Sequence, residues 1–359
     1  RKKIMTVIKT NSKPEIEPVW QLSDGLSYSA LSTWLNCREQ FRLKYVCGWT
    51  SCRFSFALEF GSAFHHLLEI FPGCGKLGYI KGRSKNGEKQ TVSEWSKKEI
   101  EKYSKRTFTT EKTKRFLPAD NHELKRCLRL VVAVFPHYAA HYQQHDMKLR
   151  WKSRENIFKF TDGSTQLTGK IDGVVKDGSK LWLFETKTKG QIDESAIRAL
   201  LHNDLQTMLY AYAIQQLYKK QPVGIIYNVV KRPGIQLRKD ETTSNWLERV
   251  ENIGTKTFPP LAENPEEYFL RWRVTLEPGE VDSWADRILR PILSEFVGWW
   301  HGWESGTEAA NCPEKNSKHY PNPAALYFRN QKSDMFHLIT TGNSEGLYQR
   351  KKSHPELTT

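Results

Sequence analysis

Two carboxylates and a lysine stand among apolar residues in the stretch "LTGKIDGVVKDGSKLWLFETKTKG", which covers residues 167–190. Residues 181–184 are apolar on both alternating faces, as in a central strand, and Glu185 and Lys187 then continue one of these faces. Asp172 lies on the preceding apolar run, and a short turn can bring it back beside Glu185. Because neighbouring carboxylates repel unless a cation neutralises them, and oxygen ligands suit hard cations, this pattern predicts a Mg²⁺ or Mn²⁺ site.

A divalent cation held in this way favours the hydrolysis of phosphodiester bonds. The cation can polarise the phosphodiester and lower the pKa of a bound water, while Lys187 adds positive charge near the developing phosphorane. Taken singly, the residues have plainer interpretations, because Asp172 could start a turn with Gly173 and the Glu-Lys pair could be a solvated strand end. The combination favours the catalytic interpretation.

The overall charge favours a polyanionic partner. Lys and Arg total 55 against 40 Asp and Glu among the 359 residues, which gives a formal net charge of +15. Such an excess fits nucleic acid best and an anionic membrane second. No apolar run reaches the roughly 18 residues of a membrane span. The first residues also lack the apolar core of a secretion signal, so an intracellular protein is expected.

Apolar periodicity predicts the helices that must position these residues. Two helices are predicted early in the chain, over residues 30–46 and 57–71. The strongly basic stretch 76–115 has few core-grade apolar residues, which indicates an exposed and partly helical insertion. A long helix follows over residues 126–144, and Pro136 is expected to kink or divide it.

Strand-like runs at 155–160, 166–176 and 180–188 are separated by "TDGST" and "KDGSK", and such D-G turns predict an antiparallel meander. A helix over 195–218 and a continuously apolar, buried strand over 223–231 follow. Later, "EEYFLRWRVTL" predicts one more strand and "SWADRILRPILSEFVGWWHGW" a Trp-rich helix. The expected fold class is therefore α/β (α+β), with a central mixed sheet containing an antiparallel meander, flanking helices and helical additions.

The motifs resemble those of a known nuclease family. "GKIDGVV" and "LWLFETKTK" are similar to the G-x-I-D and E-x-K motifs of the PD-(D/E)XK nuclease superfamily, in particular its RecB-like exonuclease branch with Cas4 and AddB nuclease domains. The resemblance implies a restriction-endonuclease-like core in which Asp172 and Glu185 are metal ligands and Lys187 is the catalytic lysine. The carbonyl of Thr186 is a further expected ligand of one or two ions.

Two more motifs extend the resemblance. "FGSAFHHLLE" resembles the family's G-x-x-x-H motif, and both the count from Gly61 and the border of the apolar helix stripe favour His65 over His66 as a metal ligand. The alternative is a surface histidine doublet without a ligand role. "NDLQTMLYAYA" resembles the Q-x-x-x-Y motif, which implies that Gln206 and Tyr210 bind the scissile strand or its phosphate. The alternative is an ordinary amphipathic helix.

The six cysteines show no C-x-x-C pair, which favours reduced thiols and argues against a zinc site of Cys ligands. "LSYSALSTWLNCREQFRLKYV" is similar to the S-x-S…C-P-x-x-F…Y segment of the same branch, with Arg38 in place of the proline. Some members bind an iron-sulfur cluster through this cysteine and three C-terminal ones. Cys37 matches the first, but the C-terminal region offers only Cys312, so no cluster is expected.

The resemblance implies a metal-dependent deoxyribonuclease, above all an exonuclease acting in DNA repair, recombination or viral DNA processing. Its expected partners are DNA and, because the chain has no G-x-x-x-x-G-K-[ST] motif, a separate helicase, single-strand-binding or recombination protein. Two alternatives stay open, a non-catalytic DNA-binding subunit that keeps the fold and an RNA-directed nuclease. The expected organisation is a polar lead (1–25), a single nuclease domain (26–332) with its catalytic core (154–231) and C-terminal additions (235–332), and a loosely structured tail (333–359).

Overall fold

The computed structural model of the protein describes residues 18–73, 80, 90–108, 120–305, 335, 338 and 345–351. These residues group into two compact units. The first takes its described residues from Arg1–Ser51, Lys159–Gly169 and Asp286–Thr359, and the second from Cys52–Phe158 and Lys170–Ala285. All the predicted site residues belong to the second unit. The single domain expected over residues 26–332 stays a prediction.

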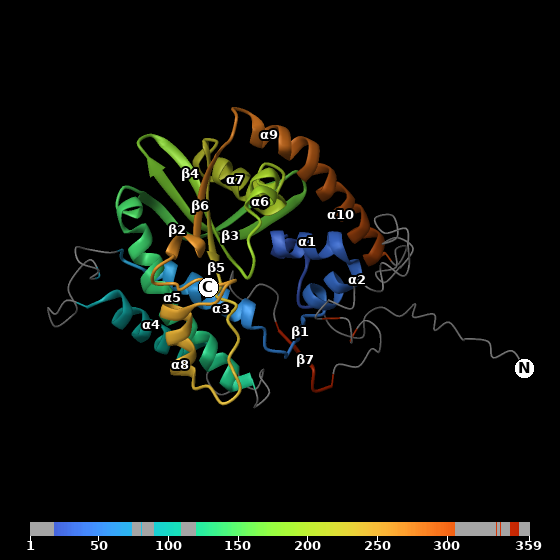
Figure 1. Ribbon diagram of the computed structural model, residues 1–359. Helices are drawn as coiled ribbons and strands as arrows, with labels where there is room; N and C mark the ends of the chain where they lie inside the picture. The colour runs from blue at the N-terminus through green and yellow to red at the C-terminus, as the bar shows by residue number, and fades with distance from the viewer. Residues whose placement is uncertain are drawn as a thin grey trace, which may run out of the picture. The chain divides into compact units, whose positions relative to one another are not determined.

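A five-stranded sheet with the order β2-β3-β4-β5-β6 forms the centre of the fold (Figure 1). The β3–β4 and β5–β6 pairs are antiparallel, whereas β4 and β5 are parallel. The expected mixed α/β class is therefore confirmed. The strands are β2 (Arg150–Asp162), β3 (Thr165–Asp177), β4 (Lys180–Lys189), β5 (Gly224–Lys231) and β6 (Phe269–Thr275).

The predicted meander is present because its two tight turns are glycine-based. Gly163 and Gly178 have φ values of 59° and 62°, a left-handed conformation that glycine adopts without a Cβ clash. Each glycine lies in a two-residue connection, and such short connections join antiparallel neighbours. The turns fix the register in which Gly173 pairs with Phe184, so that Asp172 returns to the middle of β4.

The crossover between the parallel strands contains two helices, α6 (Glu194–Leu200) and α7 (Leu205–Tyr218), where the sequence pattern predicted a single helix. The prediction was wrong at this point because the side chain of Asp204 caps a new helix, accepting a hydrogen bond of 2.8 Å from the backbone N–H of Thr207. The strand that follows, β5, is buried at every residue but its last, as predicted.

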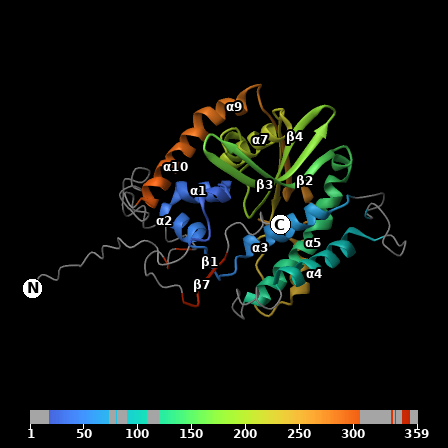
Figure 2. The same cartoon turned by 180° about the vertical axis from the view of Figure 1, so that it is seen from behind.

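Three helices, α3 (Phe56–Ile70), α4 (Val92–Phe108) and α5 (Asp120–Asp146), pack together in the second unit (Figure 2). The predicted helix over 57–71 is confirmed by α3. Pro136 lies inside α5 without dividing it. The expectation of an exposed basic insertion was wrong for α4, because Trp95, Ile100 and Tyr103 form a buried face that packs into the core.

The first unit contains the helical segment predicted over residues 30–46, but it is broken into α1 (Tyr28–Asn36), α2 (Arg38–Phe41) and a π-helical turn, Arg42–Val46. The break follows from Cys37, which has an extended backbone and accepts a hydrogen bond at Sγ from the Gln40 N–H.

The Trp-rich helix is confirmed as α10 (Arg290–Glu304), which follows α9 (Glu280–Trp284) and a π-helical turn, Ala285–Leu289. In the first unit, Trp300 of α10 packs edge-on against Trp20 with ring centroids 5.1 Å apart.

The expected loose tail contains β7 (Tyr348–Arg350), which pairs with β1 (Trp49–Ser51). The remaining elements are α8 (Thr243–Glu248), a π-helical turn at Arg249–Ile253 and 3-10 turns at Leu22–Asp24 and Pro265–Glu267. Among the described helices, none is both long and apolar enough to span a bilayer.

Candidate active site

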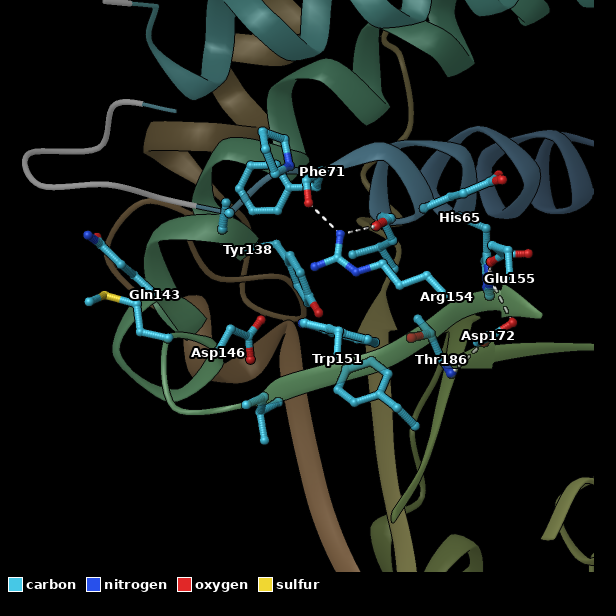
Figure 3. Close-up of a pocket in the computed structure, with 18 residues that line it drawn as sticks. His65, Phe71, Tyr138, Gln143, Asp146, Trp151, Arg154, Glu155, Asp172 and Thr186 are labelled. Atoms are coloured by element: carbon cyan, nitrogen blue, oxygen red, sulfur yellow. Dashed lines mark hydrogen bonds and ion pairs between the residues drawn. The ribbon is translucent and has the colours of Figure 1, made fainter. Parts of the chain in front are cut away.

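Three side chains from three different elements converge beside the sheet. His65 of α3, Glu155 of β2 and Asp172 of β3 each offer one ligand atom, and these atoms all lie within 4.8 Å of one another. His65 Nδ1 is 3.5 Å from Asp172 Oδ1 and 4.0 Å from Glu155 Oε1 (Figure 3). Two of the three, His65 and Asp172, are residues that the sequence motifs singled out. We refer to the three as the ligand cluster.

The backbone of β4 orients Asp172. The N–H of Thr186 donates a 2.7 Å hydrogen bond to Asp172 Oδ2, which leaves Oδ1 directed to His65. The hydroxyl of Thr186 accepts a hydrogen bond from Asn228 Nδ2 at 3.3 Å. The ligand role predicted for the Thr186 carbonyl stays a prediction.

The two adjacent histidines have different environments. His65 contacts the ligand cluster, whereas the ring of His66 stacks on Tyr103 of α4 with a centroid distance of 4.8 Å. Gly61, one turn before His65, explains the spacing of the motif. A Cβ at Gly61 would lie 2.9 Å from Thr188 Oγ1, so glycine allows α3 to approach β4 closely enough for His65 to reach Asp172.

A second group of predicted residues forms a hydrogen-bonded chain beside the ligand cluster. Lys187 Nζ donates to Glu185 Oε1 at 2.5 Å and to Gln206 Oε1 at 2.7 Å. Gln206 Nε2 in turn donates to the hydroxyl of Tyr210 at 3.2 Å. Gln206 and Tyr210, which were predicted to share a helical face, are therefore linked by hydrogen bonds to Lys187 near the end of β4. The structure brings all four side chains together.

Burial and mutual repulsion set the protonation of the carboxylates. Burial, reinforced by the charge of Asp172, raises the pKa of both Glu155 and Glu185 to about 7. Burial opposes ionisation of Asp172 as well, but the adjacent imidazolium outweighs it and lowers the pKa of Asp172. Burial would lower the pKa of His65, yet the Asp172 carboxylate prevails and raises it to about 9. A proton on His65 thus offsets the carboxylate charge.

The residues fit a divalent cation. An imidazole nitrogen and carboxylate oxygens are the ligands that Mg²⁺ and Mn²⁺ sites use. Glu185 adds a second sign, because its side chain is only 1 % exposed and its Oε2 is a buried oxygen without a hydrogen-bond partner in the described part of the chain. Buried carboxylate oxygens are normally satisfied, and a bound cation would satisfy this one. Glu185 is not within the ligand cluster itself.

Glu155 is the site residue that the sequence did not reveal. It was placed at the start of a strand, where a charged residue is usually solvated. In the structure only 10 % of its side chain is exposed, and its Oε2 accepts an ion pair of 2.7 Å from Lys170 Nζ. Its φ of 46° is left-handed, which is uncommon for a non-glycine residue in a strand and has no signature in the sequence.

Comparison with known proteins places the chain in a family. A search of curated proteins finds no match. The crystal structure of SSO0001 is 12 % identical over 41 % of this chain and 67 % of that one, with a TM-score of 0.19, a likeness too weak to support the fold. The family model of the PD-(D/E)XK nuclease superfamily matches residues 25–292, which is most of the chain and includes the ligand cluster. The protein therefore belongs to the PD-(D/E)XK nuclease superfamily.

Proposed function

We propose that the protein is a Mg²⁺- or Mn²⁺-dependent DNA exonuclease of the RecB-like branch. Membership in the superfamily implies a metal-dependent nuclease with DNA as its substrate. The observation that carries the proposal is the convergence of His65, Glu155 and Asp172 from three elements, next to the buried Glu185–Lys187 pair. The net charge of +15 supports a nucleic-acid substrate.

The metal-holding role falls to His65, Asp172 and Glu185, as the motifs imply, and to Glu155, which the geometry adds. A bound Mg²⁺ or Mn²⁺ would supply charge neutralisation at the phosphate and a lower pKa for an attacking water. In its absence the proton on His65 and the raised pKa of both glutamates keep the charge of the site low. Binding of an ion by these residues would therefore release protons from them.

Lys187 acts as a fixed cation beside the reacting phosphate. Burial opposes its charge, but Glu185 outweighs burial and raises the pKa of Lys187, so the ammonium stays protonated at neutral pH. We therefore assign it to electrostatic stabilisation and orientation of water rather than to proton abstraction. Gln206 holds the ammonium in place, and Tyr210 holds Gln206. Both are positioning residues in this account.

The exonuclease assignment rests on the order of the motifs. G-x-x-x-H, G-x-I-D, E-x-K and Q-x-x-x-Y follow one another on a helix, two strands and a helix, as the RecB-like branch would have them. The family match ends at residue 292, so the extent of the nuclease domain over residues 26–332 stays a proposal. Cys312 lies outside the described residues, so the expected lack of an iron-sulfur cluster stays a prediction.

The test uses DNA labelled at either the 5′ or the 3′ end, as single strands, duplexes and a closed circle, with matched RNA. We expect Mg²⁺-dependent release of short products from a strand end, little cleavage of the circle or of RNA, and loss of activity in Glu185→Gln. Glu263→Gln, an exposed acid elsewhere in the second unit, is the matched control. Intact DNA with the wild-type protein, or unchanged cleavage by Glu185→Gln, would refute the proposed function.

A further inference from the structure

A cavity of about 120 Å³ opens directly from the ligand cluster. His65, Glu155 and Asp172 line one part of it, while Arg154 and Trp151 line another (Figure 3). The cavity therefore joins the atoms proposed to hold the metal ion to a cationic side chain and to aromatic rings. A group bound in the cavity would therefore lie next to the proposed metal site.

Arg154 is anchored through only one of its nitrogens. Its Nη1 donates to the carbonyl oxygens of Leu68, at 3.3 Å, and of Phe71, and its Cζ lies 4.3 Å above the ring of Trp151. Among the described residues, no carboxylate lies within ion-pair distance of Arg154, and Nε and Nη2 have no hydrogen-bond partner. Neither nitrogen is one of the buried unpartnered atoms, so this edge of the guanidinium is accessible.

The backbone of β2 explains why Arg154 faces the cavity. Successive side chains of a regular strand point to opposite faces, so Arg154 and Glu155 would normally diverge. The φ of 46° at Glu155 interrupts this alternation, and both side chains line the same cavity. Left-handed residues and bulges redirect side chains beside active sites at a cost in backbone strain. The distortion thus supplies a ligand carboxylate and a guanidinium together.

The other arginine near the cavity is already engaged. Arg271 pairs with Asp146 and donates to the Tyr138 hydroxyl at 3.0 Å and to Asn228 Oδ1 at 3.0 Å. A guanidinium edge with two free N–H groups matches two oxygens of one phosphate. Of the carboxylates that line the cavity, Asp146 pairs with Arg271 and Glu155 with Lys170, so neither is paired with the free edge of Arg154.

We propose that Arg154 binds the phosphate next to the scissile phosphate in the same DNA strand. The contact uses the free Nε and Nη2 edge of its guanidinium. This inference rests on the proposed function and adds a substrate contact to it. Trp151 and the two carbonyl groups are positioning elements that hold the guanidinium in the cavity. The contact would set the register of the strand relative to the ligand cluster.

The experiment measures binding of fluorescent single-stranded oligonucleotides to the full chain in Ca²⁺, each carrying one uncharged methylphosphonate at a successive linkage. In the wild type, one linkage next to the cut should weaken binding about tenfold, the value of one charge-assisted hydrogen-bond pair. Arg154→Gln should weaken binding of unmodified DNA by about the same factor and show no further loss at that linkage. Arg150→Gln, which removes an exposed charge from the same strand, should keep the wild-type position effect.

Arg154→Lys keeps the charge without the planar fork, so it tests the contact with less risk to folding, which melting curves check. About threefold weaker binding with a reduced position effect is expected. The assignment would be overturned if both Arg154 variants bound DNA with wild-type affinity. It would also be overturned if a methylphosphonate at the same linkage weakened their binding as much as it weakens binding by the wild type. Cleavage by the wild type in Mg²⁺ is measured in the same preparation. If the wild type cleaves DNA but the effects of the Arg154 substitution and of the methylphosphonate on binding are independent, only the role of Arg154 is contradicted. If the wild type does not cleave DNA, the proposed function is contradicted.

Discussion

Two partly buried polar clusters lie beside the same sheet and differ in how completely their atoms are paired. In the first, Arg271 is stacked 3.6 Å from the ring of Tyr142 and pairs with Asp146, while Asn228 and Tyr138 hydrogen-bond both to Arg271 and to each other. In the second, the ligand cluster and Glu185, a buried oxygen of Glu185 has no hydrogen-bond partner in the described part of the chain.

The difference separates a structural network from a binding site. A buried network that satisfies its own hydrogen bonds holds strands and helices together and needs no ligand. A site with a buried carboxylate oxygen that has no partner carries a desolvation cost, which a bound cation would offset. Changes to the first cluster should therefore affect folding, and changes to the second should affect metal binding and catalysis.

The largest effect is expected for Asp172→Asn. The amide cannot supply the negative charge that the ion and His65 require, so cleavage should fall at least about 10³-fold, about 4 kcal/mol in activation free energy. Labelled single-stranded DNA with Mg²⁺ gives the rate, and urea unfolding verifies that the variant is folded. A folded variant that cleaves at the wild-type rate would contradict the role of Asp172.

Arg271→Met should act on the other cluster. It leaves the Asp146 carboxylate and the Asn228 amide without their partner, which should lower the free energy of unfolding by about 3 kcal/mol. Urea denaturation measures this change, and Arg273→Met on the same strand, with an exposed ion pair, should lose less than about 1 kcal/mol. Equal losses in the two variants would mean that the network is not a structural element.

A smaller effect is expected in the pH dependence of metal stabilisation. The folded-state pKa values of Glu155 and Glu185 are raised to about 7 from an ordinary 4.5, so their contribution to stability is complete below 4.5 and is lost as the pH rises through 7. The metal-free protein should therefore melt at lower temperature at pH 8 than at pH 5. Mn²⁺ requires the ionised carboxylates and should raise the melting temperature more at pH 8 than at pH 6.

Thermal melting with Mn²⁺ or with a chelator at each pH measures both trends. In Glu185→Gln the side chain at this position cannot ionise. The melting temperature of the metal-free variant should therefore depend less on pH than that of the wild type. A Mn²⁺ effect that is larger at pH 6 than at pH 8 would be inconsistent with raised pKa values at the site.

The parts of the site that the sequence predicted follow from local rules. The D-G turns at Gly163 and Gly178 fix a hairpin register, and the period of two along β4 then places Glu185 and Lys187 on one face. His65 was chosen over His66 because it lies four residues, about one helical turn, after Gly61. These features depend on residues close in the sequence, so pattern alone was sufficient.

The parts that escaped prediction depend on single side chains competing with a periodic pattern. Cys37 and Asp204 cap new helices within runs that have uninterrupted helical periodicity, so two helix breaks were missed. Glu155 and Arg154 face the cavity because of a left-handed backbone, and neither residue type signals that conformation. Long-range packing, not local preference, determines it.

Isothermal titration of the metal-free full chain with Mn²⁺ at pH 8 tests the central claim most directly. The account predicts saturable binding that is at least about tenfold weaker in His65→Gln, because an imidazole ligand is lost. His66→Gln, the neighbouring variant whose ring stacks on Tyr103, should bind Mn²⁺ like the wild type. Absence of saturable binding, or equal affinity of the wild type and His65→Gln, would contradict the claim that these side chains form a metal site.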